Sequence, residues 1–263
     1  MINFFRVNMF SIWAIADLHL PFGAPNKHMR IFGPQWEEYT DKIKQSWLEL
    51  VAENDLVLIP GDISWAMRLE EARLDLDWIG QLPGTKVLLK GNHDYWWGSL
   101  SKIQSILPPS CHLIQNNSFF WNGVNIAGAR LWDIPGISFN EWIDFKDFAC
   151  IKKINDEDCS EESQKIYDRE LKRLETSLKT MHSQAKLRIA MTHYPPIGAN
   201  LEETEVSRLL EKYHINICVF GHLHNVKADR EIFGMHNNIR YQLVACDYLH
   251  QFKPIKIAEL SSF

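Results

Sequence analysis

The sequence predicts an α/β fold, on three observations. Short apolar runs rich in Val, Ile and Leu recur along the 263 residues and end in Gly, Pro or Asp, which is typical of buried strands. Amphipathic helical patterns lie between the first of these runs. Hydrophobic content of 46% and charged content of 23% are those of an ordinary globular protein. Alternating strands and helices are the pattern of an α/β sheet.

The first predicted strand spans Phe10 to Ala16 and ends where the apolar N-terminal stretch meets Asp17. The stretch has a single basic residue, Arg6, and no small-residue cleavage site, so we interpret it as a strand and not as a signal peptide. The later apolar runs lie within residues 55–62, 86–94, 124–130, 187–196, 215–224, 240–248 and 254–260.

Three stretches have the periodicity of helices with one apolar face, namely residues 35–54, 68–82 and 165–182. In the first of them one stripe holds Trp36, Tyr39, Ile43, Trp47 and Leu50. Residues 133–163 fit neither pattern, because they mix aromatic and acidic residues without a period. We predict an inserted lid there, within a single domain over residues 1–263.

Composition limits the partners and the setting. A formal charge of −5 gives no general attraction to nucleic acid or anionic membrane, and no stretch reaches the roughly 18 apolar residues of a membrane span. The five cysteines are scattered without a CxxC pair, which indicates reduced thiols and not a disulfide framework or a thiolate zinc site. We therefore expect a cytoplasmic protein without a clear nucleic-acid surface.

Polar side chains follow five of the predicted strands at the point where each strand ends. The carboxyl ends of strands are where open α/β sheets bind ligands. One ion with four ligands would leave about half of the donors idle, whereas two ions that share Asp62 use them all. Nitrogen and oxygen ligands without thiolate suit Mn²⁺ first, and then Fe or Zn²⁺. The donors are two carboxylates, one amide and four imidazoles: Asp17, His19, Asp62, Asn92, His193, His222 and His224.

Each cluster has an ordinary interpretation when it is taken alone. A DxH or HxH sequence is common in turns and surface pairs, and GNHD fits a loop in which Asn and Asp cap the backbone. The glycine before Asp62, Asn92 and His222 would then serve only to make a turn. Five clusters in one chain, each behind a strand, favour a metal site over these alternatives.

In order and content, the motifs DxH, GD, GNHD, H and GHxH resemble the signature of the calcineurin-like metallophosphoesterase superfamily. The stretches "GDISWAM", "GNHDYWW" and "HYPP" also resemble a bacterial branch of predicted phosphohydrolases. The resemblance implies a four-layer αββα sandwich with two mixed sheets and the metal site at the strand ends. It implies one ion held by Asp17, His19, Asp62 and His224, and a second ion held by Asp62, Asn92, His193 and His222.

The resemblance and the donor chemistry predict a phosphoesterase with two divalent metal ions that hydrolyses a phosphate mono- or diester of a small molecule. Two cations about 3.5–4 Å apart clamp the attacking and leaving oxygens and make a bridging hydroxide available near neutral pH. His93 follows a ligand without being one, so we expect it to protonate the leaving group or to stabilise the phosphoryl group. Asp94 is expected either to hold the His93 ring or to cap the turn.

Nearby aromatic and basic residues have two interpretations each. Trp65, Trp96 and Trp97 follow Asp62 or His93 so closely that they must lie near the metals, either as an apolar wall for the leaving group or as core packing. Arg130 either meets a phosphate as a fork or forms a surface salt bridge. The aromatic residues expected to close over the leaving group from the lid are Phe139, Trp142, Phe145 and Phe148.

Two other functions share these motifs. A nuclease or a nucleotide-lipid pyrophosphatase would use the same site, although a nuclease should show a basic groove and the sequence has no cluster of five basic residues. A non-catalytic, metal-dependent binding module should lack ligands or the catalytic histidine, whereas this chain keeps them all. The sequence therefore favours an enzyme.

Overall fold

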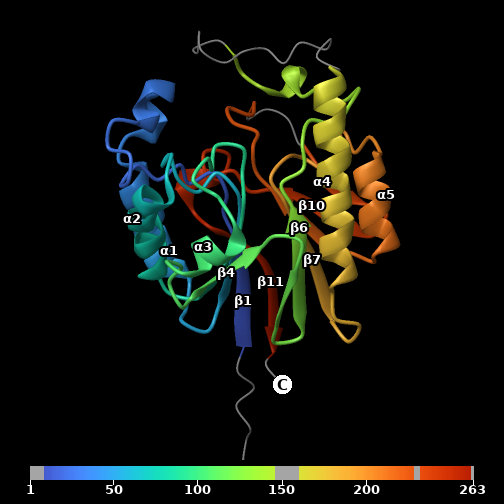
Figure 1. The fold of residues 1–263 in the computed structure, drawn as a ribbon, viewed down its shortest axis with the longest axis horizontal. Helices are drawn as coiled ribbons and strands as arrows, with labels where there is room; N and C mark the ends of the chain where they lie inside the picture. The colour runs from blue at the N-terminus through green and yellow to red at the C-terminus, as the bar shows by residue number, and fades with distance from the viewer. Residues whose placement is uncertain (1–8, 146–159, 228–231, 262–263) are drawn as a thin grey trace, which may run out of the picture.

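The computed structural model describes residues 9–145, 160–227 and 232–261. In this part of the chain two β-sheets pack face to face, with helices α1 to α3 outside the first sheet and α4 and α5 outside the second (Figure 1). Both sheets are mixed. The predicted α/β class and the four-layer sandwich are both confirmed.

The first sheet has the strand order β11-β1-β2-β3-β4. Strands β1 to β4 run parallel to one another, and the edge strand β11 is antiparallel to its neighbour β1. Every residue of β2 is buried, as expected for a strand that is covered on both faces. The bounds are Met9–Ala14 for β1, Leu56–Pro60 for β2, Thr85–Leu89 for β3, Cys111–Ile114 for β4 and Ile255–Ser261 for β11.

The second sheet has the order β5-β6-β7-β8-β10-β9, in which β6, β7, β8 and β10 are parallel and the two edge strands are antiparallel. The bounds are Ser118–Trp121 for β5, Val124–Ala129 for β6, Leu187–Thr192 for β7, Ile217–Phe220 for β8, Gly234–His236 for β9 and Ile239–Leu243 for β10.

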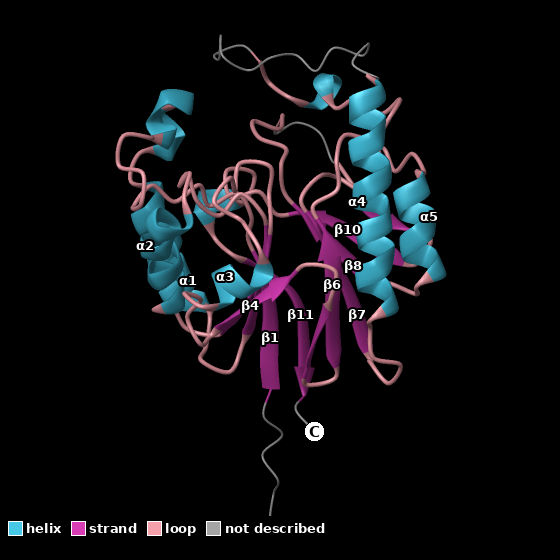
Figure 2. Cartoon of the chain, in the orientation of Figure 1, coloured by secondary structure: helices cyan, strands magenta, loops and turns pink. Residues whose placement is uncertain are grey.

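Five α-helices and several single 3₁₀ turns complete the described chain (Figure 2). Side chains of Ser160 and Thr204 cap the N-termini of α4 and α5 by accepting backbone N–H groups three residues on. The helices are α1 Tyr39–Leu50, α2 Leu69–Gly80, α3 Leu100–Gln104, α4 Glu161–Lys179 and α5 Glu205–Lys212, and the 3₁₀ turns are Met29–Phe32, Pro34–Trp36, Asn140–Trp142 and His250–Phe252.

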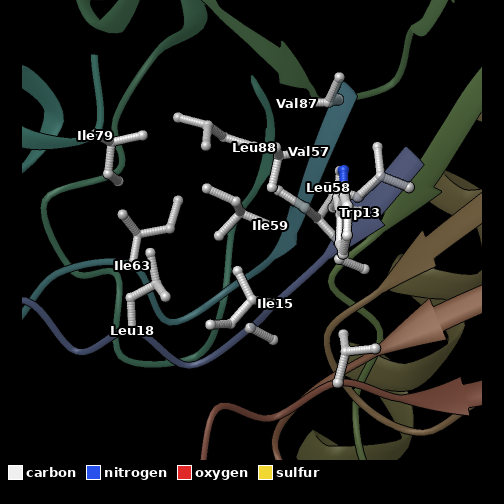
Figure 3. Packing of buried hydrophobic residues seen from close by; sticks show 14 of the residues in the cluster. Trp13, Ile15, Leu18, Val57, Leu58, Ile59, Ile63, Ile79, Val87 and Leu88 are labelled. Atoms are coloured by element: carbon white, nitrogen blue, oxygen red, sulfur yellow. The ribbon is translucent and has the colours of Figure 1, made fainter. Parts of the chain in front are cut away.

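Alternate residues of the second sheet belong to two different cores. In β8, Val219 packs into the cluster shared with the first sheet, whereas Cys218 and Phe220 pack into the cluster under α4 and α5. Successive side chains of a strand point to opposite faces, so this division places one core between the sheets and another beneath the outer helices. Figure 3 shows the first cluster, where side chains of β1, β2, β3 and α2 gather.

The two sheets are joined at the carboxyl ends of their parallel strands. Just beyond β1 and β10, Ala16 pairs with Ala245 as a parallel bridge, and the N–H of Ala16 donates to the carbonyl of Val244 at 2.7 Å. Asp17 follows this bridge directly. The join therefore fixes the start of the first predicted ligand loop against both sheets.

Several predicted bounds differ from the structure. The first helix begins at Tyr39 and not at residue 35, because the separate 3₁₀ turn Pro34–Trp36 is followed by Glu37 in an extended conformation and by Glu38 in a left-handed one, with a φ of 53°. Helix α4 begins at Glu161, so the last three residues of the predicted lid segment are helical. Among the described helices, none is both long and apolar enough to cross a membrane.

Candidate metal centre

All seven predicted ligands lie at the edge where the two sheets join. Asp17 and His19 follow β1, and Asp62 and Asn92 follow β2 and β3 of the same sheet. The second sheet supplies three imidazoles: His193 after β7, and His222 and His224 after β8. The site thus forms only when both sheets are in place.

One group of donors surrounds the Nε2 atom of His19. This atom lies 3.4 Å from Nε2 of His224 and 3.6 Å from Oδ2 of Asp62. Nε2 of His224 is in turn 3.9 Å from Oδ1 of Asp17. Ligands bound to one ion at about 2.1 Å lie roughly 3.0–3.5 Å from each other, so these atoms need only small shifts to share a cation. They match the first ligand set that the resemblance implies.

A second group surrounds the amide oxygen of Asn92. Its Oδ1 lies 2.6 Å from Nε2 of His193 and 3.1 Å from Nδ1 of His222. Nε2 of His193 is also 3.5 Å from Oδ1 of Asp62. The two oxygens of Asp62 therefore face different groups, Oδ2 the first and Oδ1 the second, which is the geometry a bridging carboxylate requires. Asp17 also reaches the second group, with Oδ1 3.9 Å from Nδ1 of His193.

In the neutral form that binds a metal ion, two imidazoles would point a bare ring nitrogen into the cluster. Nδ1 of His193 lies 3.0 Å from the carbonyl of Pro60, which can only accept, so a neutral ring presents a bare Nε2 to the oxygen of Asn92. Nδ1 of His224 lies 2.9 Å from Asp247, so its bare Nε2 faces that of His19. Acceptors that converge on acceptors are stabilised by a cation between them. The residues present therefore fit metal ions.

The pKa values of the predicted ligands, in the absence of an ion, also indicate a site that favours positive charge. Burial raises the pKa of Asp17 to about 7. Burial opposes charge on His193 and His224 also, but the nearby carboxylates outweigh it: Asp62 and Asp17 raise the pKa of His193 to about 9, and Asp247 raises that of His224 to about 10. Positive charge is thus favoured at two points inside the cluster even without an ion.

Four of the seven ligands adopt a left-handed backbone conformation. The φ angles are 58° at Asp17, 43° at His19, 51° at Asp62 and 73° at His222. Non-glycine residues rarely take this conformation, and it concentrates at functional sites where the surrounding fold enforces it. Each of these turns changes the direction in which the side chain points beyond the end of its strand.

The glycines in the motifs allow close approach and do more than make turns. A β-carbon on Gly91 would overlap with the carboxylate and backbone N of Asp62, and one on Gly221 would overlap with the carboxylate of Asp17. Both positions therefore exclude any side chain while the ligands keep their places.

His93 stands beside the ligands and does not join them. Its backbone N–H donates to Oδ1 of Asp62 at 2.8 Å, and its half-buried ring is centred 5.0 Å from that of Trp65 and 5.7 Å from that of His19. It lines the cavity above the ligands together with His19 and His222. This placement agrees with the expected catalytic role, which stays a prediction.

Asp94 is fully buried and holds the loops of its neighbours together. Oδ1 accepts the N–H groups of Ile63 at 2.9 Å and Ser64 at 3.1 Å and the indole N–H of Trp96 at 3.0 Å, while Oδ2 accepts the N–H of Gly91 at 2.8 Å. Of the two roles expected for Asp94, these contacts favour capping of the turn over holding the His93 ring. Asp94 thus positions the Asp62 and Asn92 loops relative to each other.

A cavity of 370 Å³ opens over the ligands. Histidines form one side of it, and the other lining side chains are mostly apolar. Trp65 lies on this cavity, with its ring stacked 4.6 Å from that of His19. Trp96 and Trp97 do not line it: both are buried, and the indole of Trp97 donates to Gln115. The remaining apolar lining residues are Met29, Phe32, Trp36, Phe139, Ile143, Phe145 and Leu223.

The predicted lid is described in part. Residues 133–145 form a loop with one 3₁₀ turn, and Phe139 and Phe145 of this loop reach the cavity. Phe148 lies outside the described residues. Closure of the segment over a substrate remains a prediction.

Sequence reasoning missed two side chains that support the ligands. Asp247 orients His224, and the hydroxyl of Tyr39 donates to the carbonyl of His19 at 2.5 Å. Asp247 directly follows the apolar run of residues 240–246, as the ligands follow theirs, so a signal was present. Tyr39 was assigned only to a helix stripe, and nothing in its sequence context indicates the contact.

Comparisons with known proteins agree with this geometry. The sequence model of the calcineurin-like phosphoesterase family matches residues 10–226. The chain is 34% identical over 87 residues to the Gene 66 protein of Mycobacterium phage D29, and 33% identical over 86 residues to that of Mycobacterium phage L5. Each match covers 33% of this chain and 41% of the relative, so the chain spans less than half the length of these relatives.

A solved structure extends the likeness to the whole fold. Phosphopantetheinyl hydrolase (PptH) from Mycobacterium tuberculosis superposes with a TM-score of 0.55 over 94% of this chain and 95% of its own, at 14% sequence identity. Identity at that level shows a shared fold alone. The family match covers most of the chain and includes the residues of both donor groups. The chain therefore belongs to the calcineurin-like phosphoesterase family.

Proposed function

We propose that the protein hydrolyses phosphate esters of small molecules at a dinuclear metal centre, and that the preferred leaving group is aromatic or apolar. The observation that carries the proposal is the cavity of 370 Å³, which has metal ligands and His93 on one side and aromatic side chains on the other. The two-sided placement of Asp62 supports two ions over one.

The ions would be held by the two donor groups around His19 and Asn92, with Asp62 between them. Bound there, they would neutralise phosphate charge and activate water near neutral pH. The protein supplies the positioning: Asp94 fixes the loops that carry Asp62 and Asn92, and Asp247 orients His224. His93 is placed at the cavity wall, where its ring can give a proton to the departing oxygen.

The nature of the donors supports Mn²⁺ first, with Fe or Zn²⁺ as alternatives, since imidazole, carboxylate and amide ligands lack thiolate. The described cysteines, Cys111, Cys218 and Cys246, are buried free thiols, and the thiol of Cys246 donates to the backbone carbonyl of Asp17 at 3.0 Å. Such thiols fit a reducing compartment, and we include cytoplasmic location in the proposal.

The apolar lining also favours a second candidate, hydrolysis of a nucleotide-lipid pyrophosphate, since an acyl chain would fill the same space. The PptH name adds a phosphopantetheinyl ester to the compounds worth testing, because the organic part of that group is extended and partly apolar. Both candidates use the same donors and differ only in what occupies the cavity.

A substrate panel with Mn²⁺-loaded protein tests the proposal. It compares mono- and diesters of aryl, nucleoside, acyl and phosphopantetheinyl groups with glycerol phosphate, and Asp62→Asn serves as the metal-site control. Burial of one ring or acyl group contributes about 1.5–3 kcal/mol, so we expect kcat/KM for the preferred ester to exceed that for glycerol phosphate by roughly 10–100-fold. Equal values would refute an apolar leaving-group site, and no turnover of any ester with Mn²⁺, Fe or Zn²⁺ would refute the activity.

A further inference from the structure

A second cavity at the same edge of the sheets carries a surplus of positive charge. It has a volume of 310 Å³, and its lining residues lie at the carboxyl ends of β3, β4 and β6 and on α4. Small-molecule sites typically measure about 300–1,000 Å³. Its lining shares no residue with that of the cavity over the metal ligands. Among its lining residues the cations are Lys90, Arg130, Arg169 and Arg173, and the one acid is Glu170.

Three of these cations converge on a single carboxylate oxygen. The side chain of Glu170 is 2% exposed, and its Oε1 lies 2.6 Å from Nη1 of Arg173, 3.4 Å from Nε of Arg169 and 3.6 Å from Nη2 of Arg130. Each guanidinium offers five N–H donors. One negative charge therefore faces three positive ones, which leaves a surplus of two before Lys90 is counted.

Arg130 is the member of the cluster with most to gain from a further acceptor. Its side chain is only 16% exposed, and its guanidinium lies 4.8 Å from the ring centroid of Trp132. The 3.6 Å contact with Glu170 is too long for a good hydrogen bond. The sequence suggested that Arg130 either binds a phosphate through two guanidinium N–H groups or forms a salt bridge. A salt bridge of this length leaves the guanidinium able to bind an anion as well.

The same loops that carry metal ligands fix two of the cations. Lys90 stands two residues before Asn92, so their Cα atoms lie within roughly 7 Å of each other. The carbonyl of Arg130 accepts the N–H groups of His193 at 3.1 Å and Tyr194 at 3.0 Å. The second cavity is therefore a neighbour of the metal centre along β3 and β6.

We propose that this second cavity, here called the arginine cavity, binds a phosphate-type anion. A guanidinium group binds phosphate through two parallel hydrogen bonds. Three arginines around one buried carboxylate offer more N–H donors than that carboxylate can accept. The anion is either the far phosphate of a substrate whose ester bond lies at the metal centre or a separate small molecule. The first source rests on the proposed function, whereas binding itself does not.

A substitution at Gly98 adds charge to the lining of the arginine cavity without replacing one of its arginines. Gly98 lines the cavity, and a β-carbon built on it meets no heavy atom within 4 Å. Gly98→Asp therefore adds a negative charge to the lining without a steric clash, and this charge should oppose the binding of an anion. Gly98→Asn is the matched control, since it has the same shape without the charge. Arg173→Gln removes one fork directly, and Lys179→Gln is its control on the same helix outside the cavity.

Calorimetric titration of the Mn²⁺-loaded protein with inorganic phosphate measures the binding. We expect two binding events per chain in the wild type, Gly98→Asn and Lys179→Gln, and only one in Gly98→Asp. Arg173→Gln should weaken the second event by about tenfold, the effect of losing one charged hydrogen bond. The proposal is overturned if Gly98→Asp neither loses nor weakens a binding event relative to Gly98→Asn. A single wild-type event that Gly98→Asp abolishes would support the arginine cavity and count against phosphate binding at the metal centre.

Kinetics then distinguish the two sources of the anion. If the arginine cavity holds the far end of the substrate, Gly98→Asp should raise KM for a nucleoside 3′,5′-bisphosphate by about tenfold and leave KM for the 5′-monophosphate unchanged. Unchanged KM for both, with phosphate binding lost, assigns the cavity to a separate anion. An equal rise for both compounds would overturn an independent anion site. Absence of turnover would refute the proposed function alone, because the titration does not depend on it.

Discussion

Replacement of Asp247 by asparagine tests how His224 is presented to a metal ion. Oδ1 of Asp247 lies 2.9 Å from Nδ1 of His224, and Oδ2 accepts the N–H of Asn225 at 3.0 Å. An asparagine has the same shape, but if its oxygen keeps the contact with Asn225, its NH₂ group faces Nδ1 of His224. That arrangement favours the tautomer with hydrogen on Nε2, the atom that points toward His19, and this tautomer cannot bind a metal there.

The expected size of the effect follows from burial and distance. Loss of a carboxylate behind a metal-binding histidine typically lowers metal affinity 10–100-fold, which corresponds to about 1.4–2.8 kcal/mol. The Asp247 side chain is 4% exposed, so water cannot readily replace its hydrogen bond. We therefore expect a loss near the upper limit, about 100-fold, for one of two ions.

Competition of metal-depleted protein with a chelating dye for Mn²⁺ measures this loss without relying on activity. Glu203→Gln is the matched control, because Glu203 and His236 form a similar pair at 3.0 Å away from the predicted ligands. The control should retain wild-type affinity for both ions. A change of less than about threefold at both sites in Asp247→Asn would refute the orienting role.

Three further predictions concern the ligand loop, the cavity and the outer helices. Asn92→Ala should lose one ion in metal analysis. His93→Ala should keep both ions and lower kcat by ~10²-fold or more, with partial rescue by a substrate whose leaving group has a low pKa. Loss of an ion in His93→Ala would contradict this assignment of roles. Trp36→Ala should raise KM for aryl esters by about tenfold and leave that for glycerol phosphate unchanged, and equal effects would reduce Trp36 to core packing. Hydrogen bonds, chiefly from Lys212, lower the pKa of Glu175 from 4.5 to about 2, so its contribution to stability is present above about pH 4.5 and lost as the pH falls toward 2. Glu175→Gln should therefore lower the urea midpoint at pH 7, and this difference should shrink as the pH falls from 4.5 toward 2 and in 1 M salt; a difference as large at pH 3 as at pH 7 would contradict an ionic origin.

That the seven predicted donors lie together could be predicted from the sequence, because each lies a few residues beyond the end of a largely buried strand. Such strands form continuous apolar runs in the sequence, and the donors that follow β2 and β3 are adjacent to those runs. Elements that lack this contrast were missed. Strand β5 has four residues that are mostly part-exposed, β9 has three residues and α5 has eight. Each is too short to show a clear hydrophobic periodicity in the sequence.

The surroundings of the site depended on contacts that sequence order conceals. Trp36 fitted a helical stripe, but the break at Glu37 and Glu38 separates it from α1, and its side chain lines the cavity. The cations of the arginine cavity lie in separate segments between Lys90 and Arg173, so no run of basic residues announces them. Only the packing of β3, β6 and α4 assembles them.

The left-handed turns at Asp17, His19, Asp62 and His222 narrow the range of sequences that can occupy these positions. Glycine tolerates the backbone but offers no ligand atom, and most other side chains resist it by roughly 1 kcal/mol or more. Asn, Asp and His satisfy both conditions, because they visit this region several-fold more often than other residues and carry a donor to metal. The backbone conformation and the need for a metal-binding atom therefore favour the same few residue types. These two requirements restrict the substitutions that the four positions can accept, even before any requirement for catalysis applies.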